Sequence, residues 1–268
     1  MQSSTKAPVL ALLAAAPEDE AVATELALRL GLPLLPVGSD PVSCDEVQAV
    51  LVVAAGPLSL QRTGRGVPGP VAVDFGSAAM RHRRSPGHNE LLGRAVGVEK
   101  KPQLRVLDAT AGLGRDSFVL ADIGCEVILC ERHPVIVELL RSGMNTATGR
   151  GDRWLLGVLS RMRLLPGDAR AQAPRELQGV EVIYLDPMFP PRAKSAAVKK
   201  EMALFQLLLD HDPCAQDADE LLLWALQQDV ARVVVKRPPR APSLAQRQPS
   251  HCISGKAVRY DVYVRRKL

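Results

Sequence analysis

The chain has 268 residues, 47% of them hydrophobic, enough to build one large α/β domain or a core domain with a smaller attachment. No run of eighteen or more apolar residues occurs, which argues against a membrane span, so we expect no membrane partner. The five cysteines form no CxxC pair and no zinc spacing. Such scattered thiols are typical of a cytoplasmic protein, and we expect no metal site.

The net charge of +5 is distributed unevenly along the chain. Residues 1–75 carry 4 Lys and Arg against 8 Asp and Glu, a net charge of −4. Residues 76–268 carry 30 against 21, a net charge of +9. Phosphate groups bind basic surfaces and release counterions when they do so. The excess of positive charge in the larger part therefore favours a polyanionic partner.

The first 75 residues predict a small α/β attachment. It contains strands, a helix that begins with acidic residues and ends at Gly31, and a turn-rich stretch before the last strand. The strands are expected at 9–16, 47–56 and 71–75, the helix at 18–31 and the turns at 61–70. The first apolar run could also be a weak secretory signal, but the amphipathic helix that follows favours a strand.

Residues 76–268 predict a second, larger domain that begins with a hinge-like region over residues 76–99. Strands and helices then alternate. The strands are expected at 105–110, 125–131, 163–168, 180–187 and 231–238, and the helices at 115–124, 134–147, 154–162, 198–209 and 219–228. This alternation predicts an α/β fold with a doubly wound, mostly parallel sheet. The last eighteen residues predict an antiparallel hairpin at one edge of the sheet.

A glycine-containing loop follows the first strand of the larger domain. The strand ends at Asp108, the loop contains Gly112 and Gly114, and a helix begins directly afterwards. Glycines let the backbone approach a ligand closely, and a helix N-terminus offers N–H groups. The dinucleotide-binding fingerprint requires a third glycine where Ser117 stands, and a P-loop requires Gly-Lys-Ser/Thr. The loop therefore predicts a ligand that is not held by a pyrophosphate.

Glu131 ends the second strand, twenty-three residues after Asp108. A carboxylate at this position can accept hydrogen bonds from both hydroxyls of an adenosine ribose. A solvated surface carboxylate would be the default interpretation if Glu131 stood alone. Its position behind the glycine loop favours a role in binding.

The segment VIYLDPMFPPR indicates the chemistry. A strand ends at Asp186, and Pro187 and Phe189 follow. The lone pair of an aromatic amine is delocalised into its ring, so the amine is a poor nucleophile. The Asp186 carboxylate and the Pro187 carbonyl can hold its hydrogens and favour a pyramidal nitrogen, while Phe189 offers a face for base stacking. A sulfonium methyl donor is already activated, so methyl transfer requires neither a metal nor a covalent nucleophile.

Five segments occur here in a fixed order: RHRR, LDATAGLGRDSF, ILCERHP, YLDPMFPPRAKSAAVKKEM and VVVKRP. Together they make residues 71–264 similar to the family of 16S ribosomal RNA (guanine-N2)-methyltransferases called RsmJ. The resemblance implies a class I methyltransferase fold over 76–268 and S-adenosylmethionine as donor. It also implies a substrate guanine near the 3′ end of 16S ribosomal RNA, in the small ribosomal subunit.

The resemblance also implies which residues contact the donor. They are Arg115, Asp116, Glu131, Arg132, Asp168, Ala169 and Asp186, and the glycine-loop region adds Asp108, Gly112 and Gly114. Asp168 could instead bind the adenine amine, as an aspartate does in many related methyltransferases.

Basic residues accompany these motifs. The candidates for RNA contact are Arg81, Arg83, Arg84, Arg192, Lys194, Lys199, Lys200, Lys236 and Arg237. Lys236 and Arg237 are expected to shape the rim of the pocket. Lys199 and Lys200 could equally be a solvated helix face.

Two other functions stay open. An adenine amine or a protein glutamine amide could be the methyl acceptor, because enzymes that modify either use a comparable Asp-Pro turn. A non-catalytic RNA-binding ribosome assembly factor is the alternative from a different class. A nicotinamide-dependent oxidoreductase is disfavoured by the missing third glycine.

Overall fold

The computed structural model describes residues 9–82, 90–187, 207–208 and 217–268. Two compact units make up the chain: of the described residues, 9–73 and 207–208 belong to the first unit and the others to the second. Some of the residues predicted from the sequence lie outside the described part. They are Arg83, Arg84, Phe189, Arg192, Lys194, Lys199 and Lys200, together with most of the helix expected at 198–209.

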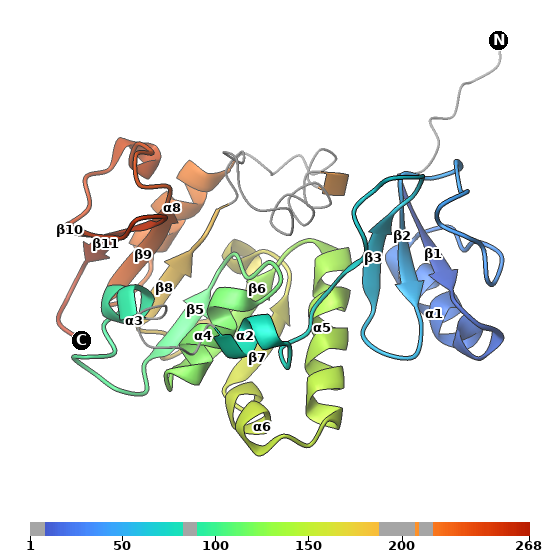
Figure 1. Cartoon of the computed structure of the whole chain (residues 1–268). Coiled ribbons are helices and arrows are strands. Elements are labelled where there is room, and N and C mark those ends of the chain that lie inside the picture. The colour runs from blue at the N-terminus through green and yellow to red at the C-terminus, as the bar shows by residue number, and fades with distance from the viewer. Residues whose placement is uncertain (1–8, 83–89, 188–206, 209–216) are drawn as a thin grey trace, which may run out of the picture. The chain divides into compact units, whose positions relative to one another are not determined.

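Over residues 9–73, the first unit contains a four-stranded sheet and one α-helix (Figure 1). The elements are β1 (Leu10–Ala14), α1 (Glu20–Leu30), β2 (Ala49–Val53), β3 (Ser59–Arg62) and β4 (Val71–Ala72). β1 and β2 are parallel, whereas β2, β3 and β4 pair antiparallel. The prediction of turns from residue 61 was wrong, because Gln61 and Arg62 pair with β2 as the end of β3. This short strand has polar residues on its half-buried face, which concealed it in the sequence.

The second unit contains a seven-stranded sheet in the order β10-β11-β9-β8-β5-β6-β7. Its strands are β5 (Arg105–Asp108), β6 (Glu126–Glu131), β7 (Met162–Pro166), β8 (Val182–Leu185), β9 (Arg232–Arg237), β10 (His251–Ser254) and β11 (Arg259–Val264). The strands from β5 to β9 are parallel, and β11 and β10 extend the sheet antiparallel beyond β9. The predicted α/β fold class with its terminal hairpin is thereby confirmed.

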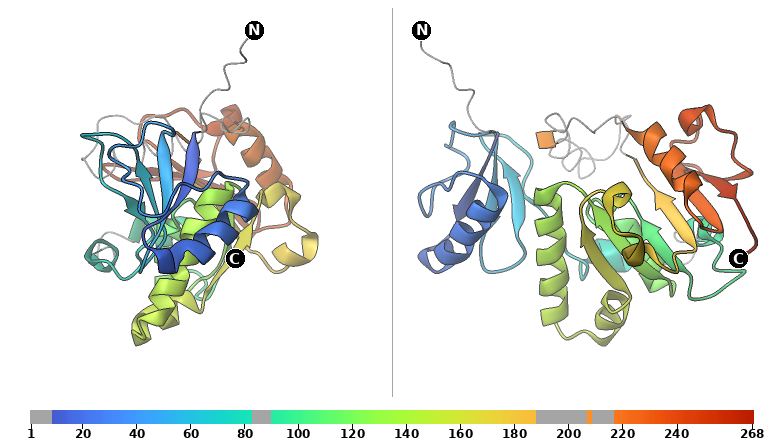
Figure 2. Two further views of the ribbon diagram at one scale, coloured as in Figure 1. Left: turned by 90° about the vertical axis from the view of Figure 1, so that its right-hand side faces the viewer. Right: turned by 180° about the vertical axis from the view of Figure 1, so that it is seen from behind.

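Helices cover both faces of this sheet. They are α2 (Ala78–His82), α3 (Glu90–Val96), α4 (Arg115–Asp122), α5 (Pro134–Gly149), α6 (Arg153–Leu159) and α8 (Ala218–Gln227). From β5, the connections through α4 and α5 lead along the sheet to β6 and β7. From β8, the connection through α8 leads the opposite way along the sheet, to β9. Right-handed crossovers therefore place α4 and α5 on one face and α8 on the opposite face (Figures 1 and 2). Within the described residues, no helix is long and apolar enough to cross a membrane.

The strand order creates a switch point between β5 and β8. These neighbours are parallel, but the connections that follow them run in opposite directions across the sheet. In open α/β sheets, ligands bind in the crevice outside the carboxyl ends of the strands at such a point. The loops after β5, β6, β8 and β9 are therefore the part of the fold that positions a site.

Aromatic residues pack around α4. Phe118 is 1% exposed; its ring stacks on Phe75 with centroids 5.1 Å apart and meets Trp154 edge-on at 5.7 Å. We expect Phe118→Leu to lower the free energy of unfolding by about 1–2 kcal/mol, because the aromatic pairs are lost. Urea titration measures this difference. Leu223→Ala, at a position 37% exposed on α8, is the control and should stay within about 0.5 kcal/mol of wild type. Equal losses for the two variants would contradict the expectation.

Candidate active site

The glycine loop begins at a buried carboxylate. Asp108 is 1% exposed, and its oxygens accept hydrogen bonds from the Ser117 hydroxyl at 2.5 Å and the Thr110 N–H at 3.1 Å. Gly114 has φ +71°, and a Cβ there would lie 2.8 Å from Leu140 Cδ2. Gly112 has φ +53°, but a Cβ there would meet nothing closer than a carbonyl oxygen at 4.0 Å. The backbone at Gly112 therefore faces open space, whereas packing against Leu140 leaves no room for a side chain at Gly114.

Burial raises the pKa of Asp108 from 3.8 to about 7, against the lowering effect of the hydrogen bonds from Ser117 and Thr110. The folded-state pKa lies above that of the unfolded chain. The stabilisation by the protonated form is therefore fully present below about pH 4 and is lost as the pH rises through about 7. We expect wild type to lose stability relative to Asp108→Asn across this interval, measured by urea titration at several pH values. A difference between the two proteins that does not vary with pH would contradict this assignment.

Glu131 ends β6 and is only 8% exposed. Its Oε2 accepts the Gly112 N–H at 2.9 Å, and its Oε1 accepts the His133 N–H at 2.7 Å. Burial raises the pKa of this carboxyl, and the two backbone hydrogen bonds oppose the rise. A carboxylate has about four acceptor positions, so this one keeps capacity for further donors while it also fixes the glycine loop.

Ion pairs join three segments beside Glu131. Arg132 Nη1 donates to both carboxylate oxygens of Asp217, at 2.9 and 3.1 Å. Arg170 also binds Asp217, and its Nη2 donates to Asp168 Oδ2 at 2.5 Å. The hydrogen bond from Arg170 lowers the pKa of Asp168 despite partial burial. The turns after β6 and β7 are thus connected through the residue that precedes α8.

The turn after β8 is tied to the loop after β5. The Asp186 N–H donates to Thr110 Oγ1 at 2.6 Å, and the Ala109 N–H donates to the Tyr184 carbonyl at 3.0 Å. The Asp186 side chain is 36% exposed, and Pro187 is buried. The carboxylate predicted to hold an amine therefore stands at the sheet edge, next to the glycine loop.

Lys236 brings two predicted site residues together. Its Nζ donates to Asp116 Oδ2 at 2.6 Å and to Asp186 Oδ2 at 2.7 Å. The Tyr184 hydroxyl also donates to Asp116 Oδ2, at 2.6 Å. The start of α4 and the ends of β8 and β9 thus form one hydrogen-bonded group around the predicted acceptor carboxylate.

Comparisons with known proteins identify the family of this chain. The family model described as "Putative SAM-dependent methyltransferase" matches residues 40–265. Ribosomal RNA small subunit methyltransferase J of Cellvibrio japonicus is 46% identical over 250 residues, which cover 91% of this chain and 92% of that protein. The enzyme of the same name from Pseudomonas aeruginosa is 43% identical, with 99% and 98% covered. The chain belongs to the ribosomal RNA small subunit methyltransferase J family.

A solved structure extends the likeness to the fold. The crystal structure of a SAM-dependent methyltransferase from Neisseria gonorrhoeae is 36% identical and superposes with a TM-score of 0.69. It covers 94% of this chain and 95% of its own. The class I methyltransferase fold implied by the sequence resemblance is therefore confirmed.

Three basic residues predicted to contact RNA lie in the described part of this methyltransferase J family member, and each has partners within the protein. Arg81 binds Asp152 at 2.6 Å, and its guanidinium lies 5.2 Å from the centroid of Trp154. Arg237 is 4% exposed and donates to the Pro242 carbonyl. Lys236 binds the two aspartates described above. A contact between RNA and any of the three stays a prediction.

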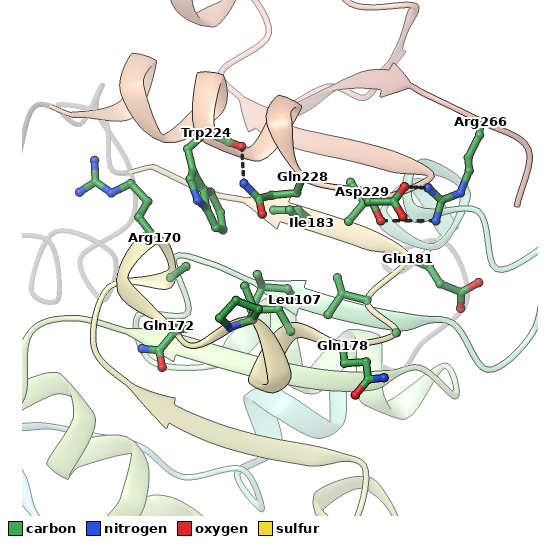
Figure 3. Close-up of a pocket in the computed structure, with 16 residues that line it drawn as sticks. Leu107, Arg170, Gln172, Gln178, Glu181, Ile183, Trp224, Gln228, Asp229 and Arg266 are labelled. Atoms are coloured by element: carbon green, nitrogen blue, oxygen red, sulfur yellow. Dashed lines mark hydrogen bonds and ion pairs between the residues drawn. The ribbon is translucent and has the colours of Figure 1, made fainter.

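The second unit also has a cavity of about 520 Å³ beside α8, which is open to solvent on one side (Figure 3). Its floor includes Leu107 and Ile183, and Trp224 points into it from the helix. Arg266 and Asp229 form an ion pair at one end. Of the residues predicted to contact the donor, only Ala169 lines this cavity. The cavity is therefore separate from the group at the sheet edge.

Sequence reasoning missed several partners of the predicted residues in this methyltransferase J family member. They are Thr110, Arg170, Tyr184 and Asp217. Strand alternation could have found Tyr184, because it precedes Asp186 by two residues and shares its side of β8. No local pattern could have found Asp217, since its contact with Arg132 spans 85 positions of sequence.

Proposed function

We propose that this chain transfers a methyl group from S-adenosylmethionine to the exocyclic N2 amine of a guanine in 16S ribosomal RNA. The observation that carries the proposal is the position of Asp186, at the carboxyl end of β8 and hydrogen-bonded to Thr110 of the glycine loop, whose Gly112 is in turn held by Glu131. The names of the relatives, which are ribosomal RNA small subunit methyltransferases, support the RNA substrate.

The residues present suit an adenosine-containing donor. Glu131 is a buried acceptor for ribose hydroxyls, and the open face of Gly112 leaves room for a ligand against the backbone. The other proposed contacts are Asp108, Gly114, Arg115, Asp116, Arg132, Asp168, Ala169 and Asp186. When bound, S-adenosylmethionine supplies a methyl group already activated by its sulfonium.

The protein's task is to make the amine nucleophilic. The Asp186 carboxylate and the Pro187 carbonyl accept the two amine hydrogens, so the nitrogen lone pair is withdrawn from the ring and directed away from these acceptors. Formation of the nitrogen–methyl bond would break the bond between the methyl carbon and sulfur, with S-adenosylhomocysteine as the leaving group. The N–H then becomes acidic, and Asp186 is placed to take the proton. Phe189, outside the described residues, is proposed from the sequence to stack on the base.

The larger, basic part of the chain would hold the RNA. We assign residues 76–268 to the methyltransferase domain and 1–75 to an attached domain, and we place the protein in the cytoplasm, where ribosomes are assembled. Contacts with phosphates are proposed for the other basic residues singled out in the sequence, which comprise Arg81, Arg83, Arg84, Arg192, Lys194, Lys199, Lys200 and Arg237.

The test is transfer of labelled methyl from S-adenosylmethionine to small ribosomal subunits that lack the modification. The RNA is then digested and its nucleosides are separated. We expect label in N2-methylguanosine from 16S RNA. Label in N6-methyladenosine or in a ribosomal protein would overturn the guanine assignment. Absence of any label, with the donor bound, would favour a non-catalytic RNA-binding role.

A further inference from the structure

Lys236 occupies a defined place in the sheet. It lies in β9, directly between β8 and β11, and is paired with Tyr260 on the β11 side. On the β8 side, Leu185 pairs with Val235, so the next residues along the two strands are Asp186 and Lys236. Register therefore sets the lysine beside the acceptor carboxylate, and its Nζ lies 2.7 Å from Asp186 Oδ2.

The surroundings of the ammonium group are acidic on several sides. Asp116 binds it from α4 at 2.6 Å, and Asp108 lies close enough to Asp116 and Asp186 to be affected by their charges. The hydroxyl of Tyr184 completes the group through Asp116, and Tyr260 faces it from β11. Burial opposes the charge on Lys236, but Asp186 and Asp116 outweigh burial and raise the pKa of the lysine above its ordinary value.

We propose that Lys236 is a positioning residue for methyl transfer, which fixes the orientation of the Asp186 carboxylate and keeps that carboxylate ionised. The inference rests on the proposed role of Asp186 as acceptor for the amine. A charge-assisted hydrogen bond to Oδ2 restricts rotation of the carboxylate, so the same face is presented to each incoming amine. The cation also offsets the repulsion between the carboxylates of Asp116 and Asp186, which share one ammonium group.

Lysine rather than arginine suits this position. One compact ammonium can reach single oxygens of two carboxylates on different elements, whereas a planar guanidinium prefers both oxygens of one carboxylate. A side chain that is 28% exposed and holds two aspartates is also a poor phosphate ligand. The proposal therefore assigns Lys236 to the chemistry of the site in place of the RNA contact expected from sequence.

The test compares the pH dependence of kcat for wild type, Lys236→Met and Lys236→Arg on small ribosomal subunits. In Lys236→Met we expect kcat near neutral pH to fall about 10- to 100-fold. The acidic limb of its profile should move to higher pH, because Asp186 then ionises without a neighbouring cation. Lys236→Arg retains a cation and should retain the position of the limb. Lys100→Met, at an exposed lysine in the turn that precedes β5, is the matched control.

The outcomes separate the two proposals. A wild-type enzyme without methyl transfer defeats the proposed function. If wild type is active, two results for Lys236→Met overturn the proposed role of Lys236 and leave the proposed function intact. One is an unchanged pH profile of kcat, and the other is a kcat lowered equally at every pH. Circular dichroism establishes that each variant is folded. If Lys236→Met does not fold, Lys236→Gln replaces it as an uncharged side chain of similar length and must show the same shift of the acidic limb.

Discussion

Replacement of Asp186 by alanine is expected to lower kcat for methyl transfer about 10²- to 10³-fold, the usual cost of removing one preorganised electrostatic partner of a transition state. The structure gives the reason. Asp186 stands at the carboxyl end of β8, its backbone is held by Thr110 at 2.6 Å and its side chain by Lys236 at 2.7 Å. Without the carboxylate, the amine loses an acceptor, and the nitrogen lone pair remains delocalised in the ring.

The measurement is kcat at saturating donor and RNA, together with the Kd of S-adenosylhomocysteine. Asp186→Asn keeps the shape of the side chain and one acceptor oxygen, so we expect an intermediate kcat. Asp45→Ala removes an exposed carboxylate of the first unit and serves as the control. A variant with its full kcat restored at high donor concentration would show that Asp186 serves only donor binding, which would contradict the acceptor role.

Replacement of Glu131 by glutamine is expected to weaken donor binding about 10- to 100-fold, because hydrogen bonds to a charged acceptor are lost. Glu131 is buried, and its two oxygens already accept the N–H groups of Gly112 and His133. An amide has a single acceptor oxygen, and its NH₂ group would face one of these donors. Donor binding therefore weakens for two reasons: the ribose loses a charged acceptor, and the glycine loop loses its hydrogen bond to residue 131.

Titration calorimetry with S-adenosylhomocysteine measures this effect. Glu126→Gln is a close control, since Glu126 begins the same strand at its amino end and is exposed. We expect its Kd to equal that of wild type. Equal Kd values for Glu131→Gln and Glu126→Gln would show that the carboxylate at the end of β6 does not hold the donor.

The regular elements of the larger unit could be predicted from sequence because local patterns specify them. β6 is a six-residue strand whose four central residues are all apolar, and α5 begins with a proline at position 134, in its first turn. Two short helices, α2 and α3, lie within the stretch predicted as a hinge. With only five and seven residues, they offer too few turns for a helical period to be recognised.

Only part of the candidate site could be predicted from the sequence in this way. Asp186 and Glu131 end apolar strands, and parallel strands place their carboxyl ends at one edge, so their proximity follows from the pattern. Lys236 was assigned to RNA because charge alone suggested it. Its two aspartate partners are 50 and 120 positions distant in sequence, and only the register of β9 and the placement of α4 bring them together.

The central claim is that the donor binds at the carboxyl ends of β5 and β6, beside Asp186. A crystal structure of the protein with S-adenosylhomocysteine tests it most directly. The account predicts that the ligand lies along the Gly112 loop, with its ribose hydroxyls hydrogen-bonded to Glu131. A ligand bound in the cavity beside α8, with no contact to Glu131, would contradict it.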